Sequence, residues 1–139
     1  ELLRLADHVL FAEPGLDRWA PLQGGAGAAE RRAALERAWR AMRSAGDARA
    51  CAVTCGERGS WWLTAQGPLH VPAPPVEAID TLGAGDVFHG AYALAIAEGR
   101  DVEAAARFAT RAAAIKCTRP GGRAGCPTRA EVAAFAARG

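Results

Sequence analysis

The sequence predicts a layered α/β fold, and three observations carry that prediction. Short runs of apolar and β-branched residues come first along the chain, for example at 50–54 and 60–64. Stretches with apolar residues at helical spacing follow one another after residue 84. Half of the 139 residues are hydrophobic, so the chain can bury a sizeable core. Strands followed by several helices favour a sheet flanked by helices over a bundle or a sandwich.

Each element has its own local signal. We expect a first strand at 9–12, which Pro14 and Gly15 should end. A helix is predicted over about 28–45, where apolar residues recur three and four positions apart. The remaining predicted elements are strands at 50–54, 60–64 and 69–71 and helices at about 85–98, 101–116 and from 128 onward.

Composition excludes several classes of protein. The net charge of +2 and the lack of a basic stripe interleaved with aromatic residues argue against a nucleic-acid partner. No run of 18 apolar residues appears, so no membrane-spanning segment is expected, and no secretory signal is visible. The four cysteines form no C-x-x-C pair, which argues against structural zinc and fits a reducing, cytoplasmic location.

The run from Gly83 to Asp86 carries the clearest chemical signal. Its small residues let the backbone approach a ligand closely. The run lies at the start of a predicted helix, where free N–H groups and the positive end of the helix dipole favour an anion. Amides aimed in this way stabilise the spread negative charge of a phosphoryl group in transfer. The residues therefore predict an anion hole.

Asp86 lies at the beginning of the same helix. A carboxylate at that place is close to the anion hole and to any hydroxyl group that attacks there. The helix terminus favours the charged form of a carboxylate, so Asp86 can accept the hydroxyl proton as a general base. A lone G-x-G-D would more often be an ordinary turn, but the longer run from Asp80 to Asp86 is far more specific.

That run resembles the second signature of the ribokinase-like (PfkB) carbohydrate kinases. Segment 53–60 is similar to the T-x-G-x-x-G turn that this family places beside the ATP phosphates. Segments 108–114, 121–122 and 127–132 resemble later parts of the family in the same order, so the match covers nearly the whole chain. The resemblance implies a ribokinase-like layered fold with a central sheet flanked by helices.

The resemblance also implies roles for individual residues. Asp86 would be the base that activates a sugar hydroxyl, with the amides of Gly83, Ala84 and Gly85 as the anion hole. The residues implied to contact ATP are Thr54, Gly56, Gly59, Gly85 and Thr110. The expected cofactors are ATP and Mg²⁺.

Many members of the family bind a monovalent cation, such as K⁺, beside the anion hole. Its ligands would here be Asp80 and the backbone carbonyls of Leu82, Lys116, Arg119 and Gly121. Leu82 replaces the commoner small or hydroxyl residue, a change that a carbonyl ligand survives.

The chain departs from the family at one element. Members of the family commonly carry an N-x-x-E element that is linked to magnesium and phosphate. Segment 10–15 has no counterpart of it, because no Asn stands before Glu13 and Glu13 does not align with the Glu of the element. A subgroup that includes ketohexokinase-like and sulfofructose-kinase-like chains departs there too. Segment 116–125 also resembles that subgroup, and this resemblance favours a ketose-type substrate.

The expected activity is ATP-dependent transfer of the γ-phosphoryl group to a sugar hydroxyl. Two alternatives remain open: a nucleoside kinase of the same fold, and a nucleotide-binding fragment without turnover. Motifs of P-loop kinases, Rossmann oxidoreductases and serine hydrolases are lacking. The expected partners are ATP and a small sugar. A second copy of the chain, forming a homodimer, is a further candidate partner.

The expected domain organisation follows from length and resemblance. A length of 139 residues suits one domain. The chain begins with Glu1 rather than Met, and the resemblance covers only the second half of the family. We therefore expect residues 1–139 to be a single but incomplete ATP-binding domain, without the N-terminal sugar-binding half and lid.

Overall fold

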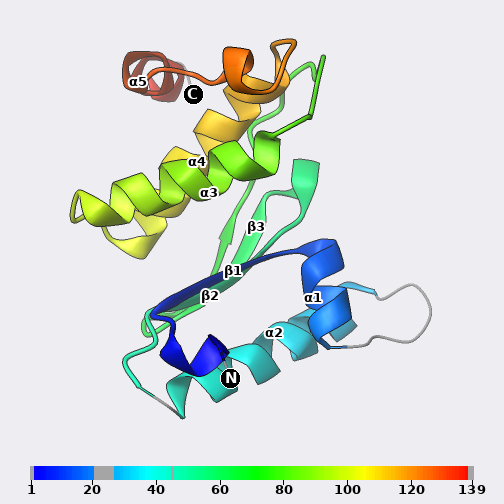
Figure 1. Cartoon of the computed structure of the whole chain (residues 1–139), viewed down its shortest axis with the longest axis vertical. Coiled ribbons are helices and arrows are strands. Elements are labelled where there is room, and N and C mark those ends of the chain that lie inside the picture. The colour runs from blue at the N-terminus through cyan, green and yellow to red at the C-terminus, as the bar shows by residue number, and fades with distance from the viewer. Residues whose placement is uncertain (1, 21–26, 45, 138–139) are drawn as a thin grey trace. The chain divides into compact units, whose positions relative to one another are not determined.

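The computed structural model describes residues 2–20, 27–44 and 46–137. The strands, with two helices between the first and the second of them, come before residue 72, and helices follow (Figure 1). The elements are β1 His8–Ala12, α1 Glu13–Trp19, α2 Ala28–Arg43, β2 Ala50–Thr54, β3 Ser60–Thr64, β4 Gly67–Val71, α3 Ala84–Ala97, α4 Val102–Cys117 and α5 Arg129–Ala136. This order confirms the α/β class predicted from the sequence.

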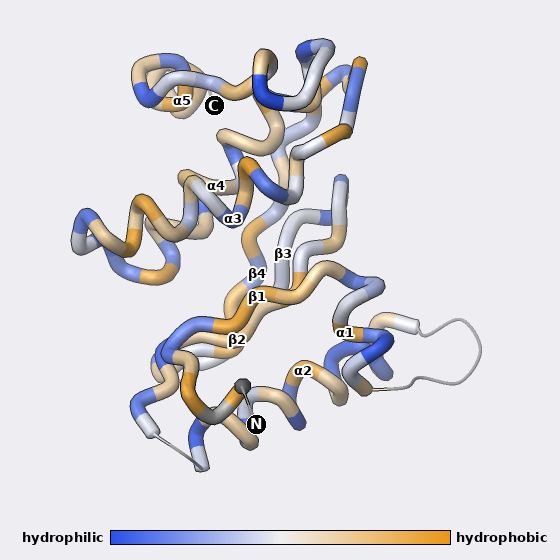
Figure 2. The backbone as a smooth tube through the Cα atoms, in the orientation of Figure 1, coloured by the Kyte–Doolittle hydropathy of each residue, from blue (hydrophilic) through white to orange (hydrophobic). Residues whose placement is uncertain are grey.

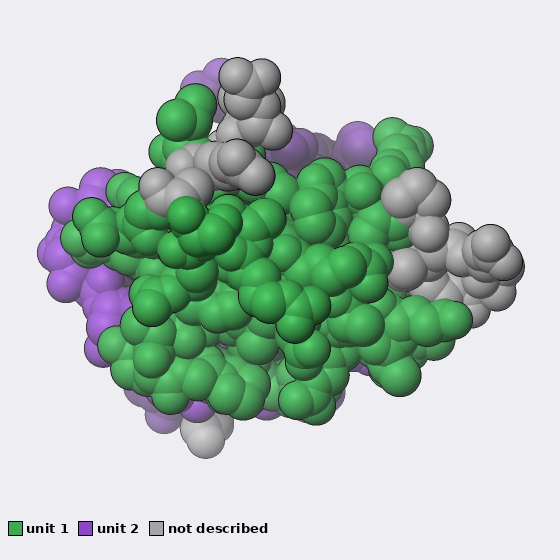
Figure 3. All heavy atoms as spheres, turned by 90° about the horizontal axis from the view of Figure 1, so that it is seen from below, with its two compact units in different colours: residues 1–55, 60–70 green, residues 56–59, 71–139 purple. Residues whose placement is uncertain are grey.

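The chain forms two compact units, which Figure 3 colours separately. Unit 1 comprises residues 1–55 and 60–70 and contains strands β1 to β3, most of β4, and helices α1 and α2. Unit 2 comprises residues 56–59 and 71–139 and contains helices α3, α4 and α5. Each unit is described by itself below.

The sheet has four strands in the order β1-β2-β3-β4. Strands β1 and β2 are parallel, with His8 opposite Ala50, and the intervening crossover carries α1 and α2. Strands β2 and β3 are antiparallel, with Ala50 opposite Thr64, and a short turn joins them. The sheet is therefore mixed, because a helical crossover permits a parallel neighbour and a tight turn requires an antiparallel one.

The core of unit 1 lies between the sheet and its two helices. Hydrophobic residues are concentrated along β1 and β2 (Figure 2). Leu16 of α1 and Met42 of α2 are fully buried and pack with Cys51 and Val53 of β2. Small residues such as Ala38 let α2 approach the strands closely.

Helix α1 was not predicted from the sequence. Pro14 and Gly15 were expected to end the first strand, which does end at Ala12, and both residues lie in the first turn of α1. Proline is well tolerated there, because its missing N–H has no intrahelical partner at the start of a helix. Strand β4 also begins two residues earlier than predicted, at Gly67.

In unit 2, α3 packs along α4 (Figure 1). Phe88 and Tyr92 of α3 are buried, as is the alanine-rich side of α4 around Ala105 and Ala109. Helix α5 packs on α4, and Val132 is its buried residue. These contacts fix the start of α3 relative to the end of α4, where the candidate site lies.

No helix in the part of the chain that the structure describes is both long enough and apolar enough to span a membrane.

Candidate active site

The turn before α3 has a backbone conformation that requires glycine. Gly83, the residue before the helix, has φ 77° and ψ 3°, in the left-handed region that side chains disfavour. The Ala84 amide donates to the Thr81 carbonyl at 3.1 Å, and the Val87 amide donates to the Gly83 carbonyl at 2.9 Å. The chain thus turns sharply into α3, with its first helical hydrogen bond at Val87.

This start leaves amides of the first turn available to a ligand. No side chain caps the helix, and Gly85 and Asp86 are both exposed at its second and third positions. The first-turn amides of a helix have no intrahelical acceptor, so those of Gly85 and Asp86 can donate outward. The Ala84 amide, which the sequence assigned to the anion hole, is already used in the turn with Thr81.

The Asp80 carboxylate organises the segment before this turn. One oxygen accepts from the Leu82 amide at 2.8 Å, and the other accepts from the Gly121 amide at 2.8 Å. The hydrogen bond from Leu82 is the largest cause that lowers the pKa of Asp80. The bond from Gly121 and the positive charge of Lys116 lower this pKa further. Asp80 is therefore held as a carboxylate that joins the turn before α3 to the loop after α4.

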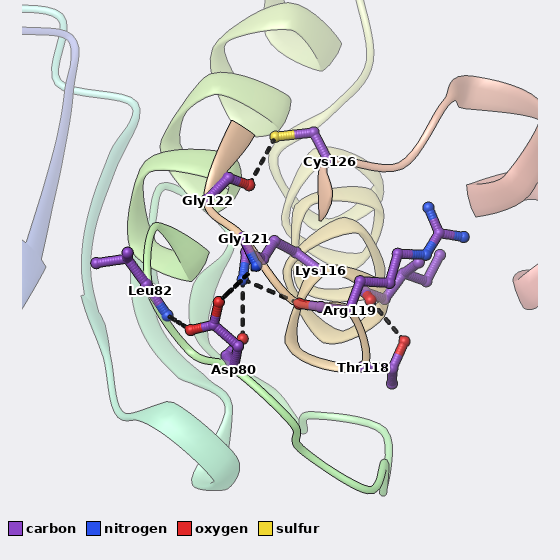
Figure 4. A network of polar contacts seen from close by, with 9 residues as sticks. Asp80, Leu82, Lys116, Thr118, Arg119, Gly121, Gly122 and Cys126 are labelled. Atoms are coloured by element: carbon purple, nitrogen blue, oxygen red, sulfur yellow. Dashed lines mark hydrogen bonds and ion pairs between the residues drawn. The ribbon is translucent and has the colours of Figure 1, made fainter. Parts of the chain in front are cut away.

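Lys116, near the end of α4, is completely buried. Its Nζ donates to the Asp80 carbonyl at 2.9 Å and to the Arg119 carbonyl at 3.4 Å. It also lies 3.5 Å from Oδ2 of Asp80. Figure 4 shows this ammonium among residues assigned to the monovalent cation site. The resemblance implied a role for the carbonyl of Lys116 only. A role for the Lys116 side chain was not predicted, although a lysine between Ala112 and Cys117 was a visible signal.

Backbone contacts complete the junction. The amides of Ile79 and Asp80 both donate to the Cys117 carbonyl, at 2.8 and 3.1 Å. A Cβ atom on Gly83 would lie 3.8 Å from the Cα atom of Gly122. The glycine turn, the Asp80 segment and the loop after α4 therefore lie together within unit 2.

The residues predicted to contact ATP divide between the units. Thr54 belongs to unit 1, where its hydroxyl donates to the Phe11 carbonyl at 3.4 Å. Gly56 and Gly59 belong to unit 2. Thr110 is buried in α4, and its hydroxyl donates to the Ala106 carbonyl at 2.8 Å, so this donor is satisfied within the helix.

Gly59 is a position where only glycine fits. Its φ is +83°, and an added Cβ atom would lie 2.1 Å from the Val71 carbonyl oxygen and 2.7 Å from the Ala73 nitrogen. The glycine therefore allows the turn that ends with it to approach the backbone at 71–73 within unit 2.

Arg119 and His89 in unit 2 both have polar partners. Arg119 pairs with Glu131 at 2.6 Å, and His89 approaches the Gly85 carbonyl at 2.7 Å through Nδ1. Glu13 in unit 1 pairs with Arg31 at 3.0 Å. Among residues 2–20, 27–44 and 46–137, no cluster of three or more His, Cys, Asp or Glu side chains could hold a metal ion.

Comparison with known proteins gives a consistent result. The family model described as "pfkB family carbohydrate kinase" matches residues 1–129. A ribokinase from Bacillus subtilis is 46% identical over 80 residues, which make up 58% of this chain and 27% of the relative. The chain thus matches only about a quarter of that relative's length.

Solved structures agree with the sequence match. A putative ribokinase from Agrobacterium tumefaciens is 37% identical with a TM-score of 0.84, covering 99% of this chain and 42% of that one. A putative ribokinase II from E. coli, in complex with ATP and Mg²⁺, is 28% identical with a TM-score of 0.80 and covers 99% of this chain and 41% of that one. Both similarities extend over the elements described above.

Proposed function

Because the chain belongs to the pfkB family of carbohydrate kinases, we propose that its protein transfers the γ-phosphoryl group of ATP to a hydroxyl group of a small sugar. The Bacillus subtilis relative and the two solved structures that this chain resembles are described as ribokinases or putative ribokinases. These descriptions support a sugar as the acceptor. The chain spans less than half of those structures, so the activity is proposed for the protein in its full native length.

The observation that carries the proposal is the start of α3. An uncapped helix terminus at the exposed residues Gly85 and Asp86 offers a site for negative charge, and the Asp86 carboxylate lies in the same turn. An anion site alone would bind phosphate, and a carboxylate alone would bind a cation. The two together suit a reaction in which a hydroxyl loses its proton while a phosphoryl group approaches.

In the proposed reaction, Asp86 accepts the proton of the sugar hydroxyl as its oxygen attacks the γ-phosphorus atom. The bond from that phosphorus to the bridging oxygen of ATP breaks, and ADP leaves with the electron pair. The Gly85 amide at the open helix start and the Gly83 amide, which the resemblance assigns to the anion hole, stabilise the charge on the transferred group. The Ala84 amide holds the turn instead, through the Thr81 carbonyl.

Magnesium would enter as part of the nucleotide substrate. Mg²⁺ commonly keeps several waters and binds through substrate phosphates with few protein ligands. The residues proposed for the nucleotide are Thr54, Gly56, Gly59, Gly85 and Thr110. Gly59 would contribute by allowing the close approach of the turn to the backbone at 71–73. Thr110 would contribute through its packing in α4, because its hydroxyl already donates to the Ala106 carbonyl.

A substrate panel tests this proposal. The full-length protein is incubated with Mg-ATP and separate pentoses, hexoses, ketoses and nucleosides, and ADP release is followed by a coupled assay. We expect sugar-dependent ADP release and a phosphorylated sugar detectable by mass spectrometry. Turnover on a nucleoside alone, or on none of the compounds while ATP still binds, would contradict the proposal.

A further inference from the structure

The ammonium group of Lys116 occupies an unusual position for a lysine side chain. Lys116 is the only lysine in the sequence, and its side chain has no exposed surface. A buried charge is costly unless it is paired and hydrogen-bonded. Here the ammonium has the Asp80 carbonyl at 2.9 Å, the Arg119 carbonyl at 3.4 Å and the Asp80 carboxylate at 3.5 Å (Figure 4).

These acceptors belong to the set that the resemblance assigned to a monovalent cation. A K⁺ site is built from several oxygens that replace the ion's hydration shell. In this protein the carbonyls of Asp80 and Arg119 already accept hydrogen bonds from the ammonium. The carbonyls of Lys116 and Gly121 accept backbone amides, from Arg119 at 3.1 Å and from Gly125 at 3.2 Å.

The residues therefore do not fit a bound K⁺. A second cation among these oxygens would lie beside the ammonium, and like charges at such short range repel. An ammonium group carries the same single positive charge as K⁺ and has three N–H donors to direct at oxygens.

The surrounding chain makes room for the lysine. Gly125 is buried, and a Cβ atom on it would lie 3.4 Å from Cε of Lys116 and 3.3 Å from Cβ of Arg119. The contact with Arg119 is tighter than ordinary packing and the one with Lys116 is at its lower limit, so a side chain at Gly125 would press on Arg119 and touch the end of the lysine stem. The glycine and the lysine thus belong to one arrangement.

We propose that Lys116 is a built-in replacement for the monovalent cation, so that this protein works without K⁺. The ammonium holds the Asp80 carbonyl, and the Asp80 carboxylate holds the amides of Leu82 and Gly121. Leu82 leads directly into the Gly83 turn, so Lys116 is a positioning residue for the anion site. The proposal rests on the proposed function for its consequence in catalysis, but its structural claim stands apart from turnover.

Thermal unfolding in different salts tests that structural claim directly. The full-length protein is melted in chlorides of K⁺, Na⁺ and N-methylglucamine at one ionic strength. We expect the same Tm in all three, because no site for K⁺ remains. A Tm that rises specifically in KCl, with the increase growing with KCl concentration as binding requires, would overturn the proposal.

Lys116→Ala provides the complementary test. Removing the side chain leaves the oxygens without a cation, so we expect Tm to fall by roughly 4 °C or more and KCl to restore part of the loss. Arg111→Ala is the matched control, since it removes one positive charge from the same helix outside the network, and its Tm should not respond to K⁺. A Lys116→Ala protein that folds but gains nothing from KCl would refute the replacement. If that variant does not fold, the salt series on the parent protein decides.

Turnover separates this proposal from the proposed function. If the parent phosphorylates a sugar, its kcat should be the same in KCl and in N-methylglucamine chloride, and a tenfold activation by K⁺ would contradict the inference. If the parent phosphorylates nothing, the proposed function fails, but the Tm measurements still test the role of Lys116.

Discussion

Helices α3 and α4 start in different ways, and the difference separates a structural helix terminus from a candidate functional one. Helix α4 is preceded by the cap residue Asp101, whose carboxylate accepts a hydrogen bond from the Ala104 amide at 2.7 Å. Helix α3 is preceded by Gly83, which provides no side-chain cap. Both have an aspartate near the start, but Asp101 lies at the cap position and Asp86 at the third helical position.

The two aspartates therefore differ in the role that their position allows. A carboxylate at the cap position satisfies the amides of its own helix, as Asp101 does. Asp86 lies too far along α3 to cap it, and the Gly83 turn leaves the first amides to a ligand. The missing cap costs α3 about 1 kcal/mol relative to a capped start.

The largest expected effect is on turnover, and it should distinguish Asp86 from Asp101. Asp86→Asn should lower kcat by about 10²- to 10⁴-fold, because the amide cannot accept the hydroxyl proton. ATP affinity should be kept or increased, since a negative charge beside the phosphates is removed. Turnover and nucleotide binding by calorimetry check this. Asp101→Asn is the control, since Asn caps a helix as well as Asp, and it should leave both quantities unchanged.

A methyl group tests whether the open start of α3 must stay open. Gly85→Ala meets no atom within 4 Å and should stabilise the helix by up to about 1 kcal/mol. The same methyl would stand where a phosphoryl group approaches, so turnover should fall by about 10- to 100-fold.

Gly15→Ala in α1, another helical glycine with open space, is the control for this test. It should gain stability without losing activity. Urea unfolding and kcat/KM check both proteins. Full activity of Gly85→Ala would argue that nothing approaches these amides.

Removing the cap of α4 should affect folding alone. Asp101→Ala leaves the Ala104 amide without its acceptor and should cost about 1 kcal/mol of stability. Once corrected for the folded fraction, kcat should match that of the parent. A specific loss of turnover in Asp101→Ala would remove the distinction between the two helix starts.

The smallest effect concerns a third helix start, that of α5. Glu131 accepts bonds from Arg119 and from the amide and hydroxyl of Thr128, and these partners lower its pKa from 4.5 to about 2. A carboxyl with a lowered pKa adds stability above its unfolded pKa, and that stability is lost as the pH falls from about 4.5 towards 2. Unfolding measured at several pH values should show a shallower decline over this range in Glu131→Gln. An identical decline would contradict the assignment.

The sequence predicted the regular elements well and the side-chain network poorly. Strands β2 and β3 were predicted at their observed residues, because turn signals bound each apolar run. The starts of α4 and α5 were also predicted to within one residue, since the capping residues Asp101 and Thr128 act locally. Helix α1 was missed because Pro14 and Gly15 were interpreted as a stop.

The site was predictable only as far as backbone signals reach. The Gly83 turn and Asp86 stand in one continuous run, so the sequence located them. The role of the Lys116 side chain depends on Asp80, which lies 36 residues earlier, and on the space beside Gly125. A contact between distant segments leaves no periodic pattern in a single sequence. The lean towards a ketose-type substrate also stays a prediction.

The central claim is that the start of α3, and not that of α4, receives the transferred phosphoryl group. The most direct measurement is a ¹H–¹⁵N spectrum of the full-length protein, with and without Mg-ADP and aluminium fluoride, an analogue of the phosphoryl group in transfer. We predict large shifts of the Gly83, Gly85 and Asp86 amides and none of the Ala104 amide. Unchanged resonances at 83–86 in a protein saturated with the analogue would contradict the account.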